Sequence, residues 1–573
     1  MMKHVTSALR FGILALLLGL ATTLSAQVGG VPGAIIDIEN QNYRTAIKKL
    51  DKVKDDGNRR DRAVAQYYLG FAKYMLGVQR QQDGLQDRAE SLFAEAETHF
   101  DEGMNLKRDY PYNYAGKGLI QAQRLEVDNA KANLQKAIEM APSDVDLLIT
   151  IAEAYVRIYK QEGVNESTQK NAIREATKIL TRATTIDEEN SDIKIALGDV
   201  YNAQNIPDLA KTNYQEAIEI NPGNAEAHYK LGKLLLEQEK YQEAQAALLQ
   251  AKDVRPDFAP TYLALAELYM LAQQYKYAKK ELEAYRDLLQ EAGSDMTYVN
   301  AQYGINLYLT KNFEEAVTQL QSALQDTSSF VLQRLYAYSL AETDQYEQAK
   351  TAIETFFNET EKKFIIAKDY RYHGTILHNL GQNEAAIEKF NKAVEMDPRI
   401  TGVYKSMYEI YKENEEYEQA VYYLTKEYEQ TNSLTDLFYV GYYTYSKLGE
   451  YEKADSIFAV LNERAPTFID AFYYRGMADI RIENEDTTKQ GIAVEPFIAM
   501  INQVEEQGKT EKYGKQLKSA YEYLAIHFYR EEEDDESYKY LKALKALDPD
   551  NATVEKLMPY VSPEGEDGTD AGG

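Results

Sequence analysis

An alanine recurs at intervals of about 34 residues along most of this chain of 573 residues. Six of the ten intervals have the same length, as from Ala210 to Ala244, and the others are close to it or somewhat longer. A constant period of this kind is typical of repeat architectures, in which one small unit is stacked many times. The chain is therefore expected to form one stacked array and not several unrelated domains. The recurring alanines are Ala96, Ala130, Ala176, Ala210, Ala244, Ala278, Ala316, Ala349, Ala386, Ala420 and Ala454.

Other positions keep the same period. A small residue stands twelve positions before the alanine, as at Gly198 and Gly232, and a large apolar residue stands four positions after it, as at Leu248. In several units a proline follows twelve positions after the alanine, as at Pro222 and Pro256. Small residues let two helices approach closely, and proline ends the second helix. The pattern predicts two amphipathic helices in each unit.

These positions resemble those of the tetratricopeptide repeat (TPR) family. The resemblance is clearest in residues 190–224 and in AEAHYKLGKLLLEQEKYQEAQAALLQAKDVRPDF at 225–258. It implies an all-α protein, a right-handed α-solenoid of about thirteen stacked helix-turn-helix TPR units. The expected organisation is a signal peptide at 1–26, an N-terminal helical cap at 27–61, the TPR solenoid at 62–551 with insertions near 78–90, 160–171 and 483–515, and a C-terminal capping segment and disordered tail at 552–573.

The first residues have the pattern of a secretory signal peptide. Lys3 and Arg10 precede an apolar run at 11–20, and Ala26 offers a small-residue cleavage site. The apolar run is shorter than the roughly 20 residues that span a membrane, and an uncleaved N-terminal anchor is the alternative. Because the chain has no cysteine, no lipid anchor is expected, and no transmembrane span should remain after signal cleavage. The mature chain is expected to be exported, and to be periplasmic or secreted.

Composition and missing motifs exclude several classes of function. The net charge of -28 disfavours nucleic acid, which needs a basic surface. The absence of cysteine excludes thiolate catalysis and cysteine-ligated zinc or iron–sulfur clusters. No P-loop, GxSxG or HExxH motif occurs, and the repeats leave no room for a separate catalytic domain. The chain is therefore predicted not to be an enzyme and to need no cofactor or metal.

In the TPR family the first helix of each unit lines a concave groove that binds protein or peptide partners. Carried onto this chain, the resemblance implies two apolar and aromatic stripes on that wall. An apolar stripe that faces solvent usually indicates a contact surface. The alternative is that neighbouring units or an N-terminal segment fill the groove. The candidate groove residues are Leu263, Met270, Leu271, Tyr298, Ile305, Tyr308, Leu309, Arg334, Tyr338, Tyr439, Tyr443, Tyr473 and Met477.

The favoured hypothesis is a non-catalytic TPR scaffold of the bacterial-type cell envelope, with a protein or peptide partner bound in its concave groove. One alternative is a glycan- or cell-wall-binding helical-repeat protein, because tyrosines can stack on sugars. The absence of tryptophan weakens that alternative. Another alternative is a periplasmic holding chaperone, for which an acidic surface around an apolar groove is suitable.

Overall fold

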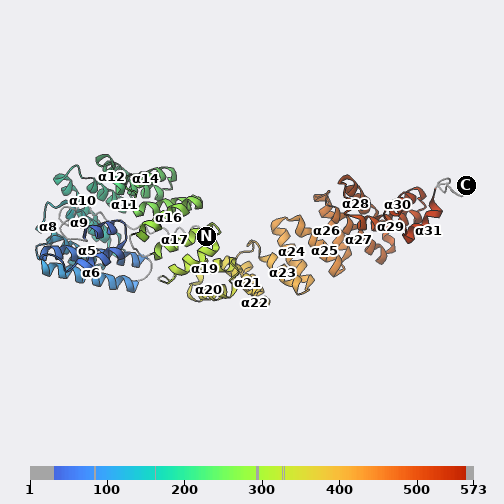
Figure 1. Cartoon of the computed structure of the whole chain (residues 1–573), viewed down its shortest axis with the longest axis horizontal. Helices are drawn as coiled ribbons and strands as arrows, with labels where there is room; N and C mark the ends of the chain where they lie inside the picture. Colours follow the sequence, from blue (N-terminus) through green and yellow to red (C-terminus); the bar gives the residue numbers. More distant parts are fainter. Residues whose placement is uncertain are drawn as a thin grey trace. The chain divides into compact units, whose positions relative to one another are not determined.

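A computed structural model shows the chain as an array of paired helices (Figure 1). Twenty-nine helices, α3 to α31, follow one another, and no strand occurs among the described residues. The predicted signal peptide and the last eleven residues of the predicted tail lie outside the described part of the chain. The described residues are 31–82, 86–161, 163–291, 296–325, 327 and 329–562.

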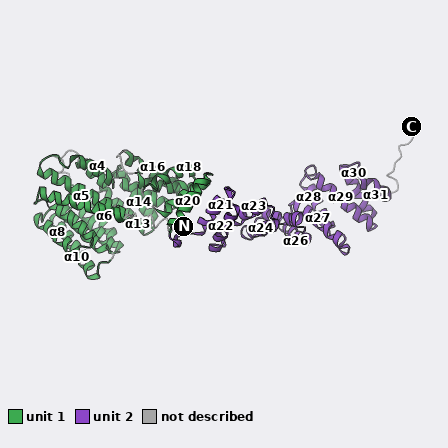
Figure 2. Ribbon diagram, turned by 90° about the horizontal axis from the view of Figure 1, so that it is seen from below, with its two compact units in different colours: residues 1–360 green, residues 361–573 purple. Residues whose placement is uncertain are grey.

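The chain divides into two compact units (Figure 2). Unit 1 ends at Thr360. Its helices are α3 (Val31–Glu39), α4 (Tyr43–Val53), α5 (Arg59–Gln82), α6 (Gln86–Leu106), α7 (Pro111–Gln123), α8 (Val127–Met140), α9 (Val145–Lys160), α10 (Glu166–Ile186), α11 (Ser191–Ala203), α12 (Pro207–Ile220), α13 (Ala225–Glu237), α14 (Tyr241–Val254), α15 (Ala259–Leu271), α16 (Tyr275–Glu291), α17 (Thr297–Leu309), α18 (Phe313–Ala323), α19 (Phe330–Glu342) and α20 (Tyr346–Glu359).

Unit 2 begins at Glu361. Its α-helices are α21 (Ala367–Asn379), α22 (Asn383–Met396), α23 (Val403–Glu413), α24 (Tyr417–Thr431), α25 (Leu434–Tyr443), α26 (Tyr451–Arg464), α27 (Ile469–Glu485), α28 (Val494–Glu506), α29 (Gly514–Arg530), α30 (Asp534–Leu547) and α31 (Ala552–Val561). From α5 to α30 the two units together contain thirteen consecutive helix pairs, preceded by α3 and α4 and followed by α31. The predicted all-α solenoid fold is confirmed.

The small residue of each pair lies where its two helices approach most closely. A Cβ atom added to Gly198 would lie 2.3 Å from Cε1 of Tyr214, and one added to Gly232 would lie 2.6 Å from Cγ of Leu248. Atoms at these distances overlap, so a side chain at either glycine would push the helices apart. The large residue four positions after the repeat alanine therefore fills the space that the glycine leaves.

The turn inside most pairs passes through the left-handed region of the backbone. Glu239, between α13 and α14, has a φ of 59°, and Gln273 and Lys311 have φ values of 59° and 61° at equivalent turns. In unit 2, glycine takes this position at Gly381 and Gly449, with φ values of 71° and 70°. The left-handed conformation costs a residue with a side chain roughly 1–2 kcal/mol. Most turns of unit 1 therefore carry a small local strain.

The predicted insertions are largely helical. Most of 78–90 extends α5 and α6, and part of 160–171 forms the first turns of α10. The segment 483–515 contains α28, which is the second helix of its pair. Residues 83–85 and 162 fall outside the described part of the chain. These segments therefore lengthen or complete helix pairs.

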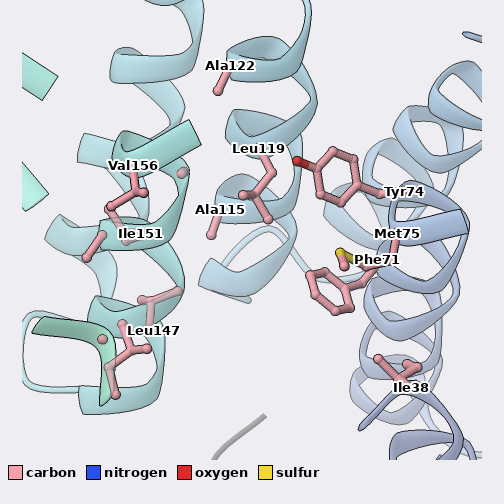
Figure 3. Close-up of a cluster of buried hydrophobic side chains, with 14 of the residues drawn as sticks. Ile38, Phe71, Tyr74, Met75, Ala115, Leu119, Ala122, Leu147, Ile151 and Val156 are labelled. Atoms are coloured by element: carbon pink, nitrogen blue, oxygen red, sulfur yellow. The ribbon is translucent and has the colours of Figure 1, made fainter. Parts of the chain in front are cut away.

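The apolar faces of neighbouring pairs merge into continuous cores. In unit 1 one cluster runs from α3 to α13, and Figure 3 shows part of it around Ile38, Phe71, Leu119 and Ile151, each of which is buried. Burying one such side chain stabilises the folded state by about 1.5–3 kcal/mol. In unit 2 the buried apolar residues form several smaller clusters. Stability in both units therefore comes mainly from contacts between adjacent helices.

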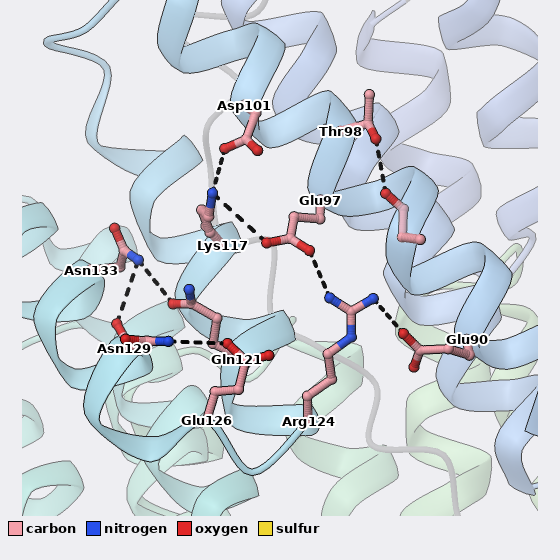
Figure 4. A network of polar contacts seen from close by, with 11 residues as sticks. Glu90, Glu97, Thr98, Asp101, Lys117, Gln121, Arg124, Glu126, Asn129 and Asn133 are labelled. Carbon is pink, nitrogen blue, oxygen red and sulfur yellow. Dashed lines mark hydrogen bonds and ion pairs between the residues drawn. The ribbon is translucent and has the colours of Figure 1, made fainter.

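Polar side chains also join one pair to the next, as Figure 4 shows for α6 and α7. The guanidinium of Arg124 contacts Glu97 at 2.6 Å and Glu90 at 2.5 Å. The ammonium of Lys117 contacts Asp101 at 2.6 Å. Ion pairs that remain partly exposed contribute about 0–1 kcal/mol each. These contacts therefore orient α7 on α6 more than they stabilise it.

Candidate functional site

The candidate groove residues of unit 1 lie on the first helices of three successive pairs, α15, α17 and α19. Most of them are enclosed, and the rings of Tyr308 and Tyr338 lie 6.2 Å apart. Leu263 packs beside a buried cluster formed by α15, α16 and α17. The buried candidates are Met270, Ile305, Tyr308, Arg334 and Tyr338, and the half-buried ones are Leu263, Leu271, Tyr298 and Leu309.

The N-terminal helix pair, α3 and α4, packs against the face of unit 1 to which the first helix of each later pair contributes. The carboxylate of Glu39 contacts the guanidinium of Arg255 at 3.2 Å. The backbone N–H of Ala259 donates a hydrogen bond to the side-chain oxygen of Asn40, 219 residues earlier in the chain, at 3.3 Å. Part of this face in unit 1 is therefore occupied by the chain's own N-terminal pair. The sequence had left that arrangement open as an alternative to a free groove.

Tyr43, the first residue of α4, is buried where the N-terminal pair docks. Only 2% of its surface is exposed, and it lies near Arg157, Tyr229 and Tyr285. Burial raises the pKa of the Tyr43 phenol above its usual value. A small cavity of about 40 Å³ remains between Tyr43, Tyr285 and Tyr298. The candidate residue Tyr298 therefore lines a space that the N-terminal pair helps to close.

A buried set of charges lies on the first helices behind the N-terminal pair. The ammonium of Lys230 contacts Asp199 at 2.8 Å, and the hydroxyl of Tyr214 donates to the same carboxylate at 2.6 Å. Burial raises the pKa of Glu226 to about 8, and nearby Lys230 lowers it only in part. Burial also raises the pKa of Glu153 well above its usual value, although Arg157 opposes the shift. Both glutamates therefore favour the protonated form in this environment.

The second stripe, in unit 2, is more accessible. Tyr439 is 40% exposed, whereas Tyr443, Tyr473 and Met477 are half-buried. The rings of Tyr439 and Tyr443 are stacked with centroids 6.2 Å apart. Tyr443 also contacts two tyrosines outside the predicted set. These are Tyr408 and Tyr417, at 6.3 Å and 5.8 Å.

Of the remaining candidates of unit 2, Tyr473 joins the same aromatic assembly indirectly, and Met477 packs beside the buried cluster of α27 to α31. Tyr442 lies 5.4 Å from Tyr443 and 5.2 Å from Tyr474, and Tyr474 lies 5.2 Å from Tyr473. Aromatic pairs at these separations are each worth about 0.5–1.5 kcal/mol beyond the area they bury. We call Tyr417, Tyr439, Tyr442, Tyr443 and Tyr473 the tyrosine surface, and Tyr408, which is 4% exposed, packs against it. The structure therefore links the three predicted tyrosines into one continuous feature.

Lysines surround part of the tyrosine surface. The ammonium of Lys447 lies 4.8 Å from the ring centre of Tyr417, and those of Lys405 and Lys412 lie 4.9 Å and 5.1 Å from that of Tyr408. Lysines placed over aromatic rings contribute about 0.5–1 kcal/mol each at exposed sites. Two of these lysines already form ion pairs, Lys405 with Asp436 at 3.0 Å and Lys412 with Glu409. The arrangement therefore suits contact with apolar groups, with a positive charge from Lys447 beside the rings.

Sequence reasoning missed several of these residues. Tyr417 is the first residue of α24, the second helix of its pair, and Tyr408 does not stand at a groove position of the family. The one available signal was the density of tyrosine between 404 and 451. Nothing in the sequence pattern indicated that Asn40 would contact Ala259.

The described residues offer little sign of a metal centre or a membrane span. No group of three or more histidine, aspartate or glutamate side chains in the described ranges is placed to hold a metal ion. Among the same residues no helix combines the length and the apolar character that crossing a bilayer requires.

Comparison with protein families finds the same repeat. A family model described as TPR repeat matches residues 198–239, and one described as tetratricopeptide repeat matches 225–258 and 373–400. No curated protein matches the chain. The matched segments lie on α11 to α14 in unit 1 and on α21 and α22 in unit 2. Both units therefore contain recognisable TPR sequence.

Solved structures that are similar to parts of this chain include two described as TPR proteins. The C-terminal part of a TPR repeat-containing protein from Cytophaga hutchinsonii is 25% identical, with 44% of this chain and 97% of that chain covered and a TM-score of 0.36. The protein YrrB, described as a TPR protein with an unusual peptide-binding site, is 20% identical over 32% of this chain and 92% of its own, with a TM-score of 0.29. The Cut9–Hcn1 complex is 14% identical over 70% of this chain and 93% of that chain, with a TM-score of 0.30.

The family matches agree with the fold. They fall on segments where the repeat spacing is kept and where two helices pack around a glycine, as at Gly198 and Gly232. The same pairing continues from α5 to α30 outside the matched segments. The chain is a multi-repeat member of the tetratricopeptide repeat family.

Proposed function

We propose that this protein is a non-catalytic scaffold of the cell envelope that binds a protein partner through the tyrosine surface of unit 2. The observation that carries the proposal is the contrast in accessibility. Tyr439 presents 40% of its surface to solvent, whereas Tyr43 of the N-terminal pair packs on the corresponding face of unit 1 and is 2% exposed. The scaffold role is the one that TPR repeats usually serve.

The chemistry of the tyrosine surface favours a protein partner. Tyrosine buries a large ring, keeps a hydroxyl for hydrogen bonding and loses little side-chain freedom, so it dominates many interfaces. Lys447 adds a positive charge beside the ring of Tyr417, whereas Lys405 and Lys412 are paired with Asp436 and Glu409. We therefore propose a partner segment that combines apolar side chains with acidic ones. Complementary charge of this kind speeds association and fixes orientation.

Export is part of the same proposal. Its support is the sequence at 1–26, which has a basic start, an apolar run and a small-residue cleavage site. The expected mature N-terminus follows Ala26. Mass spectrometry of the protein from a fractionated native host tests this directly. An intact N-terminus in the cytoplasmic fraction would contradict it.

Site-specific crosslinking tests the binding surface. A photo-reactive residue at Tyr439 should capture one protein in high yield in cells. The matched control is Tyr422, which is 53% exposed and lies on α24, the second helix of its pair. The same probe at Tyr422 should capture little. Equal capture at both positions, or none at Tyr439, would contradict the proposal.

An alanine variant then measures the contribution of the surface. Tyr443→Ala should weaken partner binding about 10- to 100-fold, the range typical of an interface hot spot, whereas Tyr422→Ala should not change it. Capture of many unrelated exported proteins at Tyr439 would instead support the holding-chaperone alternative.

A further inference from the structure

A pocket of about 670 Å³ opens in unit 1 between α18, α19 and α20, apart from the tyrosine surface. Tyr336 of α19 contributes a half-buried ring, and Gln321 and Gln348 come from α18 and α20. Pockets that bind small organic molecules usually measure about 300–1,000 Å³. This volume is therefore sufficient for a ligand of several rings.

The lining of the pocket is almost free of charge. Glu359 is the single aspartate, glutamate, lysine or arginine among its ten lining residues, although 27% of the whole chain is charged. Glu359 already accepts a hydrogen bond from the side-chain amide of Gln333 at 2.5 Å. An anionic ligand would find no lysine or arginine among the lining residues, and a cation would find one carboxylate, which Gln333 already engages. The pocket is therefore suited to an uncharged molecule.

The same lining is rich in groups that both donate and accept hydrogen bonds. A glutamine amide offers an N–H₂ donor and a carbonyl acceptor, and a hydroxyl offers both as well. Gln321 and Gln348 are exposed, whereas the hydroxyls of Thr351 and Thr355 already donate to the backbone carbonyls of Glu347 and Thr351, at 3.2 Å and 2.9 Å, and can only accept from a ligand. The carbonyl oxygen of Gln333 is buried without a partner among the described residues. The pocket thus has unused capacity for hydrogen bonding.

One wall of the pocket is apolar. It combines the ring of Tyr336 with the side chains of Leu324 and Ala352. A flat aromatic ring next to neutral amides matches a molecule with C–H groups on its faces and hydroxyls around its rim. Sugar rings have this arrangement. An extended peptide would instead need separate recesses for alternating side chains, and the lining is mostly amide and hydroxyl.

We propose that this pocket binds an uncharged carbohydrate, with Tyr336 as the stacking platform and Gln321 and Gln348 as the groups that hydrogen-bond to hydroxyls. The pocket uses none of the residues of the tyrosine surface, so binding here is independent of the protein partner. Failure of one proposal leaves the other standing.

The test uses the full mature chain and an array of uncharged oligosaccharides derived from chitin, cellulose, xylan and starch. The best binder is then titrated in solution by calorimetry. We expect saturable binding that Tyr336→Ala weakens at least tenfold. Gln348→Glu should weaken it by a similar factor, because it adds a charge to a neutral lining without changing the size of the side chain.

A matched control exists in unit 2. Gln419 follows the same Tyr-Glu dipeptide at the start of α24 as Gln348 does at the start of α20. Gln419→Glu should leave carbohydrate binding unchanged, and far-UV circular dichroism checks that each variant is folded. No saturable binding to any oligosaccharide, or binding that Gln348→Glu leaves intact, would overturn the proposal. Binding of an uncharged glutamine- and serine-rich peptide that Gln348→Glu abolishes, without carbohydrate binding, would overturn it in favour of a peptide site.

Discussion

Unit 1 and unit 2 are built from the same helix pair, but their first helices present different chemistry. In unit 1 they carry buried charges around Lys230 and Asp199, and the N-terminal pair packs on them through Tyr43. In unit 2 they carry stacked tyrosines, of which Tyr439 is well exposed. The small and apolar repeat positions therefore set the fold. The remaining positions of each first helix are free to carry different chemistry, such as buried charges or stacked tyrosines.

The largest effect expected from this comparison comes from the same substitution in each unit. Tyr43→Ala should destabilise unit 1 by about 3–5 kcal/mol, because it removes a buried ring and leaves a cavity. Tyr439→Ala should cost less than about 1 kcal/mol, because the ring is exposed. Hydrogen exchange followed by mass spectrometry measures both changes separately in the two units. Similar destabilisation by the two variants would remove the distinction between a docked and an open face.

The buried ion pair of unit 1 provides a second test. Lys230→Ala should destabilise the protein by about 3 kcal/mol or more, because Asp199 would remain buried without its cation. The control is Lys453→Ala in unit 2, where the lysine pairs with Glu450 at 2.9 Å on the exposed surface of α26. Lys453→Ala should lower the free energy of unfolding by less than about 0.5 kcal/mol. Urea denaturation of both variants measures the difference, and a small effect at Lys230 would show that water reaches Asp199.

The pH dependence of unit 1 should be smaller but measurable. The pKa of Glu226 is about 8 in the folded chain, above its value of about 4.5 in the unfolded chain. Between pH values of about 4.5 and 8 the folded chain keeps the proton on Glu226, whereas the unfolded chain has lost it. The free energy of unfolding therefore falls as the pH rises from about 5 to 8. Glu226→Gln should remove most of this decrease, because an amide does not titrate in this range.

Local hydrogen exchange in α11 to α13, measured at pH 5 and pH 8, reports on Glu226 itself. A local readout is needed because burial and the neighbouring Asp455 also raise the pKa of Asp479 in unit 2, to about 7. If hydrogen exchange in α11 to α13 depended on pH equally in the parent chain and in Glu226→Gln, the Glu226 carboxyl would be shown to be solvated.

The smallest expected effect concerns the turns within the pairs. Glu239→Gly should stabilise unit 1 by up to about 1 kcal/mol, since glycine adopts its φ of 59° without strain. Gly449→Ala in unit 2 should destabilise by a similar amount, because the φ there is 70°. Thermal denaturation of the two variants should show shifts of opposite sign. The reverse pair of signs, with Glu239→Gly destabilising and Gly449→Ala stabilising, would mean that backbone entropy, and not strain, dominates these turns.

The repeat period was sufficient to predict the helix pairs, because it fixes which positions must be small and which must be large. Gly198 shows this directly, since the ring of Tyr214 occupies the space where its Cβ would be. The docking of the N-terminal pair was not predictable in the same way. Asn40 and Ala259 meet only because small rotations between many successive pairs add up.

The candidate surfaces were predicted in part for the same reason. The family positions located Tyr439 and Tyr443, which lie together in the structure. They could not locate Tyr408 or Tyr417, whose contacts with Tyr443 depend on how one pair packs on the next. The pocket at Tyr336 has no sequence signal, because it arises from the gap between two second helices.

The contact between Asn40 and Ala259 also bears on the order in which the molecule is made. A chain synthesised or exported from its N-terminus presents α3 and α4 first, but the helices they contact around Ala259 emerge 219 residues later. Neighbouring pairs can form as they appear, whereas this closure must wait. Until then the apolar residues of the first two helices lack part of their final packing. Unit 1 thus has a built-in late step, and a translocation factor or chaperone that shields α3 and α4 would act during that interval.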